Sequence, residues 1–152
     1  MAKTRNAIKT ESQKVKEFFG NLNSDQLKIL DSSMAKIGSL YRSQVINYHC
    51  LAPTDGRCSN FSGNSPIIAY VYPSWRYPDV FLCPPFYRFP FDHGFDSQVG
   101  TLLHESSHFR PVQTEDVVYG VEDTRNLARS NSQRAIRNAD SYQYFYESIR
   151  NW

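Results

Sequence analysis

The sequence is short of cysteine, of net charge and of long hydrophobic runs. Its 152 residues include three cysteines and no C-x-x-C pair, which argues against a cysteine zinc ribbon or a thioredoxin-like redox site. With 17 Lys and Arg against 15 Asp and Glu, the net charge is +2, too small to indicate a nucleic-acid partner. The longest apolar run, 67–72, has six residues, whereas a membrane span needs about 20.

An N-terminal apolar segment is also missing, so we expect no signal peptide in this chain. The odd cysteine count allows one disulfide and one free thiol, which fits an oxidising compartment, but composition alone equally allows three reduced cysteines. Ten Phe, ten Tyr and two Trp indicate a folded chain. The length is typical of one domain and no boundary is visible, so residues 1–152 are predicted to form a single domain.

Hydrophobic periodicity predicts an α+β fold that is mostly helical, with a small β-hairpin or sheet. Apolar residues recur at helical spacing through about 5–46, and turn-forming residues follow. Two short β-branched and aromatic runs then predict an antiparallel hairpin. The predicted elements are N-terminal helices over about 5–46, a loop over 52–66, a hairpin over about 67–83, an irregular segment over 84–98, a helix over about 97–109, a loop over 112–120, and helices over 122–130 and 133–150.

The residues that carry chemistry are His104, Glu105 and His108, an H-E-x-x-H motif within the predicted helix 97–109. On a helix, residues four apart lie on one face about 6 Å from each other, so two imidazoles can occupy adjacent corners of a zinc tetrahedron. Glu105 then faces the open side of the metal, where it can act as a general base. The alternative is a pair of surface histidines on an amphipathic helix.

A catalytic zinc needs a third protein ligand, and no third histidine follows the motif. The longer H-E-x-x-H-x-x-G-x-x-H pattern fails, because Pro111 and Thr114 stand at the glycine and histidine positions. Asp116, eight residues beyond His108 and past the proline turn, can supply a carboxylate. Spacing alone leaves three competing acidic residues open: Glu115, Glu122 and Asp123.

The segments GTLLHESSHF (100–109) and TEDVVYG (114–120) resemble two motifs of the deuterolysin, or aspzincin, family of zinc endopeptidases. The resemblance extends over roughly residues 45–148, including AYVYP, VFLCPPFY and NADSYQYF. It implies a zincin-like fold and a Zn²⁺ cofactor held by His104, His108 and Asp116.

The resemblance also implies activity: a zinc-dependent endopeptidase acting on protein or peptide substrates, with Glu105 as the base. Tyr119 matches a tyrosine that hydrogen-bonds the developing oxyanion, and a phenol is a suitable neutral donor there. Without the motif we would interpret Tyr119 as a core residue. Family members are usually secreted, so secretion is expected. Two alternatives stay open: a zinc-binding but inactive interaction module, and a zinc amidase acting on a non-protein substrate.

The chain also departs from the family pattern. Gln113 replaces a motif glycine, which predicts a differently shaped loop before the third ligand. Asp140 matches an acidic residue that faces the substrate pocket in the peptidyl-lysine branch, which implies a basic residue, Lys, just after the cut. Its alternatives are helix capping and support of a ligand. Gln143 replaces a second acidic residue, which weakens that preference. Cys83 is expected to pair with Cys58 or Cys50, with Cys58 favoured.

Overall fold

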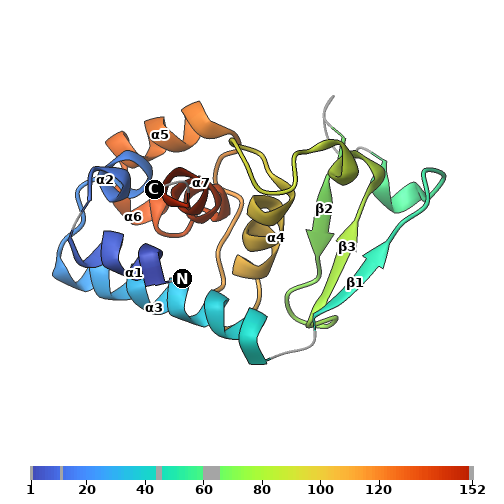
Figure 1. Ribbon diagram of the computed structural model, residues 1–152, viewed down its shortest axis with the longest axis horizontal. Coiled ribbons are helices and arrows are strands. Elements are labelled where there is room, and N and C mark those ends of the chain that lie inside the picture. Colours follow the sequence, from blue (N-terminus) through green and yellow to red (C-terminus); the bar gives the residue numbers. More distant parts are fainter. Residues whose placement is uncertain (1, 11, 44–45, 60–65, 151–152) are drawn as a thin grey trace.

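The computed structural model describes residues 2–10, 12–43, 46–59 and 66–150. Helices lie on one side of a small sheet, with α4 between the two (Figure 1). The α-helices are α1 (Ala2–Lys9), α2 (Gln13–Phe19), α3 (Ser24–Ser43), α4 (Gln98–Ser107), α5 (Val121–Ser130), α6 (Ser132–Ala135) and α7 (Ala139–Ile149). The strands are β1 (Asn47–Cys50), β2 (Ala69–Val71) and β3 (Asp79–Leu82), and two 3₁₀ helices are η1 (Gly56–Cys58) and η2 (Pro84–Arg88).

The predicted hairpin is confirmed, and the sheet contains one strand more. β2 pairs antiparallel with β3, as predicted. β1 pairs with the other edge of β3 in parallel, giving the order β1-β3-β2. The prediction of helix up to about 46 is wrong at its end, because α3 stops at Ser43 and β1 begins at Asn47. Positions 44–45 of that predicted region, and 60–65 of the predicted loop, lie outside the described residues.

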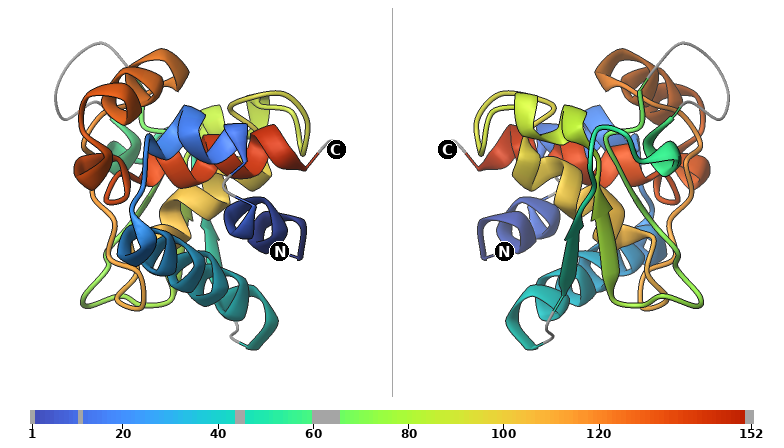
Figure 2. Two further views of the ribbon diagram at one scale, coloured as in Figure 1. Left: turned by 90° about the vertical axis from the view of Figure 1, so that its left-hand side faces the viewer. Right: turned by 90° about the vertical axis from the view of Figure 1, so that its right-hand side faces the viewer.

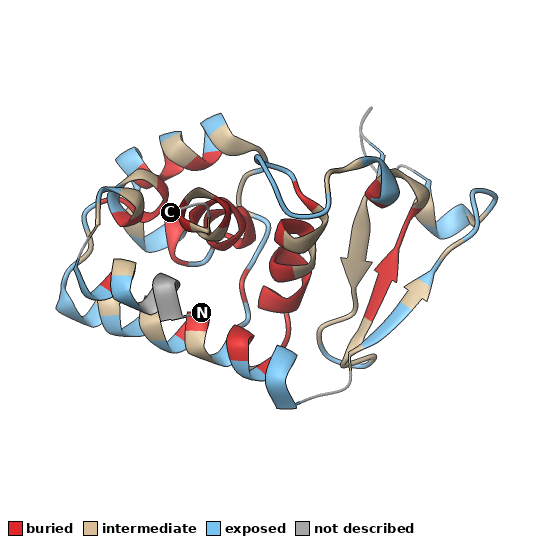
Figure 3. Cartoon of the chain, in the orientation of Figure 1, coloured by how far each residue is buried: buried red, intermediate tan, exposed pale blue. Residues whose placement is uncertain are grey.

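Two apolar clusters hold the helices and the sheet. One joins α1, α2, α3, α4 and α7, and the other packs β3 against α3 and the end of α4. The central strand β3 is buried over Val80–Leu82, whereas β1 is mostly exposed (Figure 3). Seen from the sheet side, the strands lie in front of α4 (Figure 2). Helix α4 is therefore enclosed between α7 and the sheet, as a rigid platform for side chains requires.

Helix ends in the N-terminal half follow local capping chemistry. Ser12 accepts a hydrogen bond from Val15 N–H and starts α2, so the apolar pattern through Phe19 is divided into two helices. The Asn23 side-chain oxygen accepts hydrogen bonds from Asp25 N–H and Gln26 N–H, and the Gln26 side-chain oxygen accepts one from Asn23 N–H. This reciprocal pair is a capping box that starts α3.

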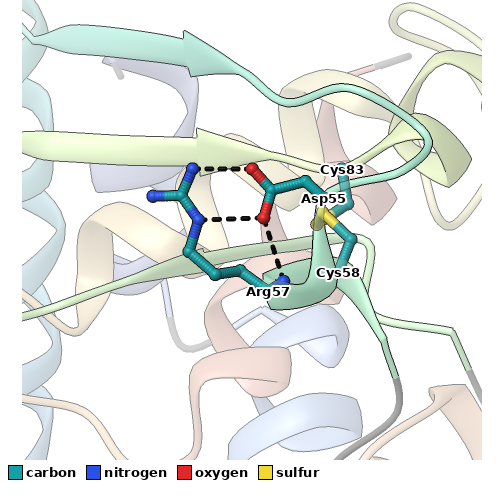
Figure 4. Close-up of a disulfide and its surroundings, with 4 residues drawn as sticks. All are labelled: Asp55, Arg57, Cys58 and Cys83. Carbon is teal, nitrogen blue, oxygen red and sulfur yellow. Dashed lines mark hydrogen bonds and ion pairs between the residues drawn. A yellow bond between two sulfur atoms is a disulfide. The ribbon is translucent and has the colours of Figure 1, made fainter.

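The cysteines form one disulfide, between Cys58 and Cys83, and Cys50 is exposed and outside it. The bond ties the loop after β1 to the end of β3 (Figure 4). Asp55 starts η1 beside it and accepts hydrogen bonds from the backbone and the guanidinium of Arg57. Among the helices of the described ranges, none combines the length and apolar character needed to cross a membrane.

Candidate active site

Helix α4 carries most of the H-E-x-x-H motif, and its start packs closely against α7. Ser97 caps α4 by accepting a hydrogen bond from Gly100 N–H at 3.0 Å. Gly100 lies directly over Glu147 of α7, and a Cβ there would come within 1.9 Å of Glu147 Oε1. A larger residue at position 100 would therefore displace the Glu147 carboxylate from its hydrogen bonds to Asp96 and Ser97. The prediction of a helix over 97–109 is confirmed as Gln98–Ser107, with His108 as its C-cap residue.

Three side chains converge at the end of α4. His104 Nε2 lies 3.2 Å from His108 Nε2 and 3.1 Å from Asp116 Oδ1, and His108 Nε2 lies 3.2 Å from the same oxygen. A tetrahedral zinc ion with bonds of 2.0–2.1 Å would separate its ligand atoms by about 3.3 Å. The near-equilateral triangle of two imidazole nitrogens and one carboxylate oxygen therefore fits a zinc ion, with a fourth corner left for solvent or substrate.

Both histidines are oriented through the nitrogen that faces away from this triangle. His104 Nδ1 lies 2.6 Å from Asp140 Oδ1, and His108 Nδ1 lies 3.0 Å from the carbonyl oxygen of Thr114. Each partner accepts a proton held at Nδ1, which leaves Nε2 available as a ligand atom. Sequence reasoning did not find the contribution of Thr114, because a backbone carbonyl leaves no signal in residue type.

The charges of the three side chains are strongly coupled when no cation lies among them. Burial lowers the pKa of His104, but hydrogen bonds to Asp116 and Asp140 outweigh it and raise that pKa to about 10. Burial likewise opposes ionisation of Asp116, yet hydrogen bonds from His104 and His108 bring its pKa well below the usual range. The site thus favours an ionised carboxylate beside positive charge, the arrangement that a divalent cation also satisfies.

The loop that brings Asp116 to the histidines is attached to a break between α6 and α7. The backbone of Glu115 bonds to Arg137 and Ala139 on either side of Asn138. The fully buried side chain of Asn138 accepts hydrogen bonds from the two N–H groups after Asp116, at 3.1 Å each. The prediction of one helix over 133–150 is therefore wrong, because residues 136–138 leave the helix to hold this loop.

Among the four acidic candidates for third ligand, the structure brings only Asp116 to the histidines. Glu115 pairs with Arg137, and Glu122 pairs with Arg125 at 2.5 Å. Gln113, which replaces the motif glycine, has φ 62° and so occupies the left-handed region that glycine favours. The loop adopts a glycine-like turn without glycine, and Asp116 still reaches the histidines.

Glu105 and Tyr119 lie on the same cleft as the three converging side chains. Glu105 is 6% exposed, and burial raises the pKa of its carboxyl. A raised pKa makes the carboxylate a stronger acceptor for a proton of water. Tyr119 is 63% exposed, with its ring centroid 6.3 Å from that of His104. Desolvation and the charge of Asp116 raise the pKa of its phenol, which stays neutral and able to donate a hydrogen bond.

Asp140 lines the cleft, but it is bonded to His104 and almost fully buried. It is 5% exposed, and while Oδ1 bonds to His104, Oδ2 accepts the N–H of Gly120 at 2.7 Å. Both oxygens are thus engaged by the metal centre and its loop. Of the roles considered for Asp140 from the sequence, this geometry favours support of a ligand.

The cleft has a volume of about 890 Å³ and runs between α4 and β2. Its wall on the sheet side is formed by residues 66–71, which include all of β2, an edge strand. Asp96, Gln143 and Tyr144 line the cleft as well. An edge strand beside a candidate metal centre offers backbone groups to an extended peptide.

Comparison with known proteins agrees with this geometry. The family model described as lysine-specific metallo-endopeptidase, aspzincin, matches residues 4–147. An extracellular protease of Aeromonas hydrophila is 32% identical over 141 residues, 92% of this chain and 37% of that protein. A peptidyl-Lys metalloendopeptidase of Pleurotus ostreatus is 47% identical over 95 residues, 62% of this chain and 53% of that protein.

A solved zinc peptidase from Grifola frondosa has the same architecture, with a TM-score of 0.81 and 30% identity over 97% of this chain and 85% of that chain. This likeness confirms the predicted α+β, mostly helical fold class. The chain spans 37% of the Aeromonas protein and 53% of the Pleurotus protein, so these relatives are longer than the part they share with it. With the family model matching nearly the whole sequence, the chain belongs to the aspzincin family.

Proposed function

We propose that residues 1–152 act as one catalytic domain, a zinc-dependent endopeptidase with His104, His108 and Asp116 as the zinc ligands. The observation that carries the proposal is the triangle of ligand atoms, whose sides of 3.1–3.2 Å suit tetrahedral zinc. Membership of a family of metallo-endopeptidases supports the same activity.

The chemistry then divides among a few residues. Zinc, when bound, polarises the scissile carbonyl and makes water more acidic. Glu105 takes a proton from the attacking water and passes it to the leaving amine, which its raised pKa supports. Tyr119 donates a hydrogen bond to the carbonyl oxygen as negative charge develops on it. Asp140 holds His104 in the orientation and tautomer that the metal requires.

The substrate is an extended peptide that pairs with the edge of β2 that no described strand occupies. β3 occupies the other edge of that strand, and residues 66–71 line the cleft beside α4. Backbone pairing of this kind binds a peptide with little regard to sequence, so side-chain pockets decide specificity. Relatives named peptidyl-Lys metalloendopeptidases, 46–47% identical over part of the chain, support a lysine just after the cut.

Secretion is part of the proposal. The Cys58–Cys83 disulfide is typical of proteins from oxidising compartments, and one relative is named an extracellular protease.

Casein digestion with and without a metal chelator tests the proposed activity. We expect a peptide-cleaving activity that disappears after chelation and returns when stoichiometric zinc is added. Sequencing of the products on a peptide library reports the residue after each cut. A protein that binds one zinc ion but cuts neither casein nor the library would instead be an inactive binding module.

We expect Tyr119→Phe to lower kcat by about 10- to 100-fold with little change in zinc content, because it removes one hydrogen bond to the developing charge. Steady-state kinetics on one peptide, with metal analysis of the same sample, measures this. Tyr87→Phe is the matched control, since Tyr87 is also exposed but does not line the cleft. An unchanged kcat in Tyr119→Phe would remove Tyr119 from the mechanism.

A further inference from the structure

The lining of the cleft includes an exposed carboxylate, Asp96, which the mechanism does not use. It lies directly before the Ser97 cap of α4, with φ 57°, in the left-handed region that non-glycine residues rarely adopt. A strained residue at a cleft persists only where its surroundings impose the conformation. The contacts around Asp96 therefore show which residues fix its backbone and side chain.

A buried acid holds the backbone on both sides of that strained residue. Glu147 is 3% exposed; its Oε2 accepts Asp96 N–H at 3.2 Å and its Oε1 accepts Ser97 N–H at 2.8 Å. The Ser97 hydroxyl donates to Oε1 as well, at 2.7 Å. Arg150 bonds to the same hydroxyl at 2.9 Å. The Glu147 carboxylate and the Arg150 guanidinium thus form a hydrogen-bond network that fixes the backbone at Asp96 and Ser97.

The side chain of Asp96 is oriented by a buried phenol. The Tyr144 hydroxyl donates a hydrogen bond to Asp96 Oδ1 at 2.7 Å, and Tyr144 is itself 2% exposed. The ring of Phe95 packs against Tyr144 with centroids 5.5 Å apart, and that of Phe18 at 6.3 Å. Among the described residues no cation pairs with Asp96, so its negative charge faces the cleft without a counter-ion from those parts of the chain.

Asp96 and Asp140 both line the cleft, but they differ in exposure and in how many of their oxygens are already bonded. Asp140 bonds to His104 and Gly120 through its two oxygens and is 5% exposed, whereas Asp96 is exposed and has one hydroxyl partner. An ammonium group needs an accessible acceptor of opposite charge. Asp96 meets that requirement better than Asp140.

We propose that Asp96 is a specificity-determining residue, whose carboxylate pairs with a basic side chain of the substrate next to the cut. The inference rests on the proposed peptidase function and names the chemistry of one substrate side chain. The methylene stem of a lysine would pack on the partly exposed ring of Phe89, which lines the cleft. The buried amide of Gln143 offers its ammonium a neutral acceptor in place of a second charge.

Two fluorogenic peptides test this inference, identical except for lysine or its neutral isostere norleucine just after the cut. For the parent we expect the kcat/KM for the lysine peptide to exceed that for norleucine. Asp96→Asn keeps the shape and tolerates the left-handed backbone, so it should lower this ratio by about 10- to 100-fold, mainly through KM for lysine. Cleavage of the norleucine peptide should change by less than about threefold.

Two comparison variants separate recognition from positioning. Asp123→Asn removes the same charge from an exposed position in the first turn of α5, outside the cleft, and should leave the ratio unchanged. Asp140→Asn acts through His104 and should weaken zinc binding and slow both peptides alike. A ratio in Asp96→Asn within twofold of the parent, or an equal loss for both peptides, overturns the inference and leaves the peptidase function intact. A parent that cuts neither peptide nor casein overturns the proposed function itself.

Discussion

Glu105→Gln should abolish peptide cleavage, by at least about 10³-fold in kcat, while the protein stays folded and binds one zinc ion. Glutamine keeps the size of the side chain but cannot accept the proton of the attacking water, and a positioned base contributes about 10²–10⁴-fold. The ligand atoms belong to other residues, so metal binding is untouched. Kinetics on casein and on one peptide, with metal analysis and circular dichroism of the same sample, measures all three quantities.

The matched control for this variant is Glu115→Gln. Glu115 is exposed, pairs with Arg137 and lies next to the ligand loop without joining the metal group. We expect it to retain activity close to that of the parent, because its place in the loop depends on backbone bonds that the substitution keeps. If Glu105→Gln cleaved at the parental rate, the mechanism assigned to this cleft would be wrong.

Asp116→Asn is expected to have the second large effect, a loss of zinc affinity of at least about 100-fold together with loss of activity. The substitution removes the one negative charge of the ligand set and leaves a neutral amide against two imidazoles. Competition with a fluorescent zinc chelator measures the affinity directly. Activity should recover in part at high zinc concentration, since Glu105 remains in place.

The controls for Asp116→Asn are the acidic residues that spacing alone left open. Glu122→Gln and Asp123→Asn alter charges in the first turn of α5, and neither side chain belongs to the metal group. Both variants should bind zinc as the parent does. Parental zinc affinity in Asp116→Asn, or a loss of affinity in Glu122→Gln, would assign the third ligand elsewhere.

The features that could be predicted from sequence depend on the spacing of residues close together in the chain. His104 and His108 lie one helical turn apart, so the pattern alone placed two imidazoles on one face of a helix. The hairpin of β2 and β3 followed from two short apolar runs. β1 was missed because it is mostly exposed and its four residues show no alternation that predicts a strand.

Other features depend on contacts between distant segments, which a local pattern does not contain. The break before α7 exists because Asn138 bonds to the backbone of the loop about 20 residues earlier. Asp140 belongs to the metal centre through a hydrogen bond across 36 residues. The corner at Asp96 depends on Glu147, which is 50 residues or more away in sequence. No period or motif indicates the partners of Asn138 or Glu147, and the motif around Asp140 did not decide between its possible roles.

By itself, the sequence determined the fold class, the helix that carries the two histidines and the residue types of the candidate metal site, because helix spacing and ligand type are local properties. The tertiary structure decided what spacing left open: Asp116 reaches the histidines, as the family resemblance implied, whereas Glu122 pairs with Arg125. It also decided that Asp140 bonds to His104 while Asp96 stays exposed at the cleft. The physical reason is that a carboxylate acquires its role from the groups packed against it, and packing joins residues far apart in the chain.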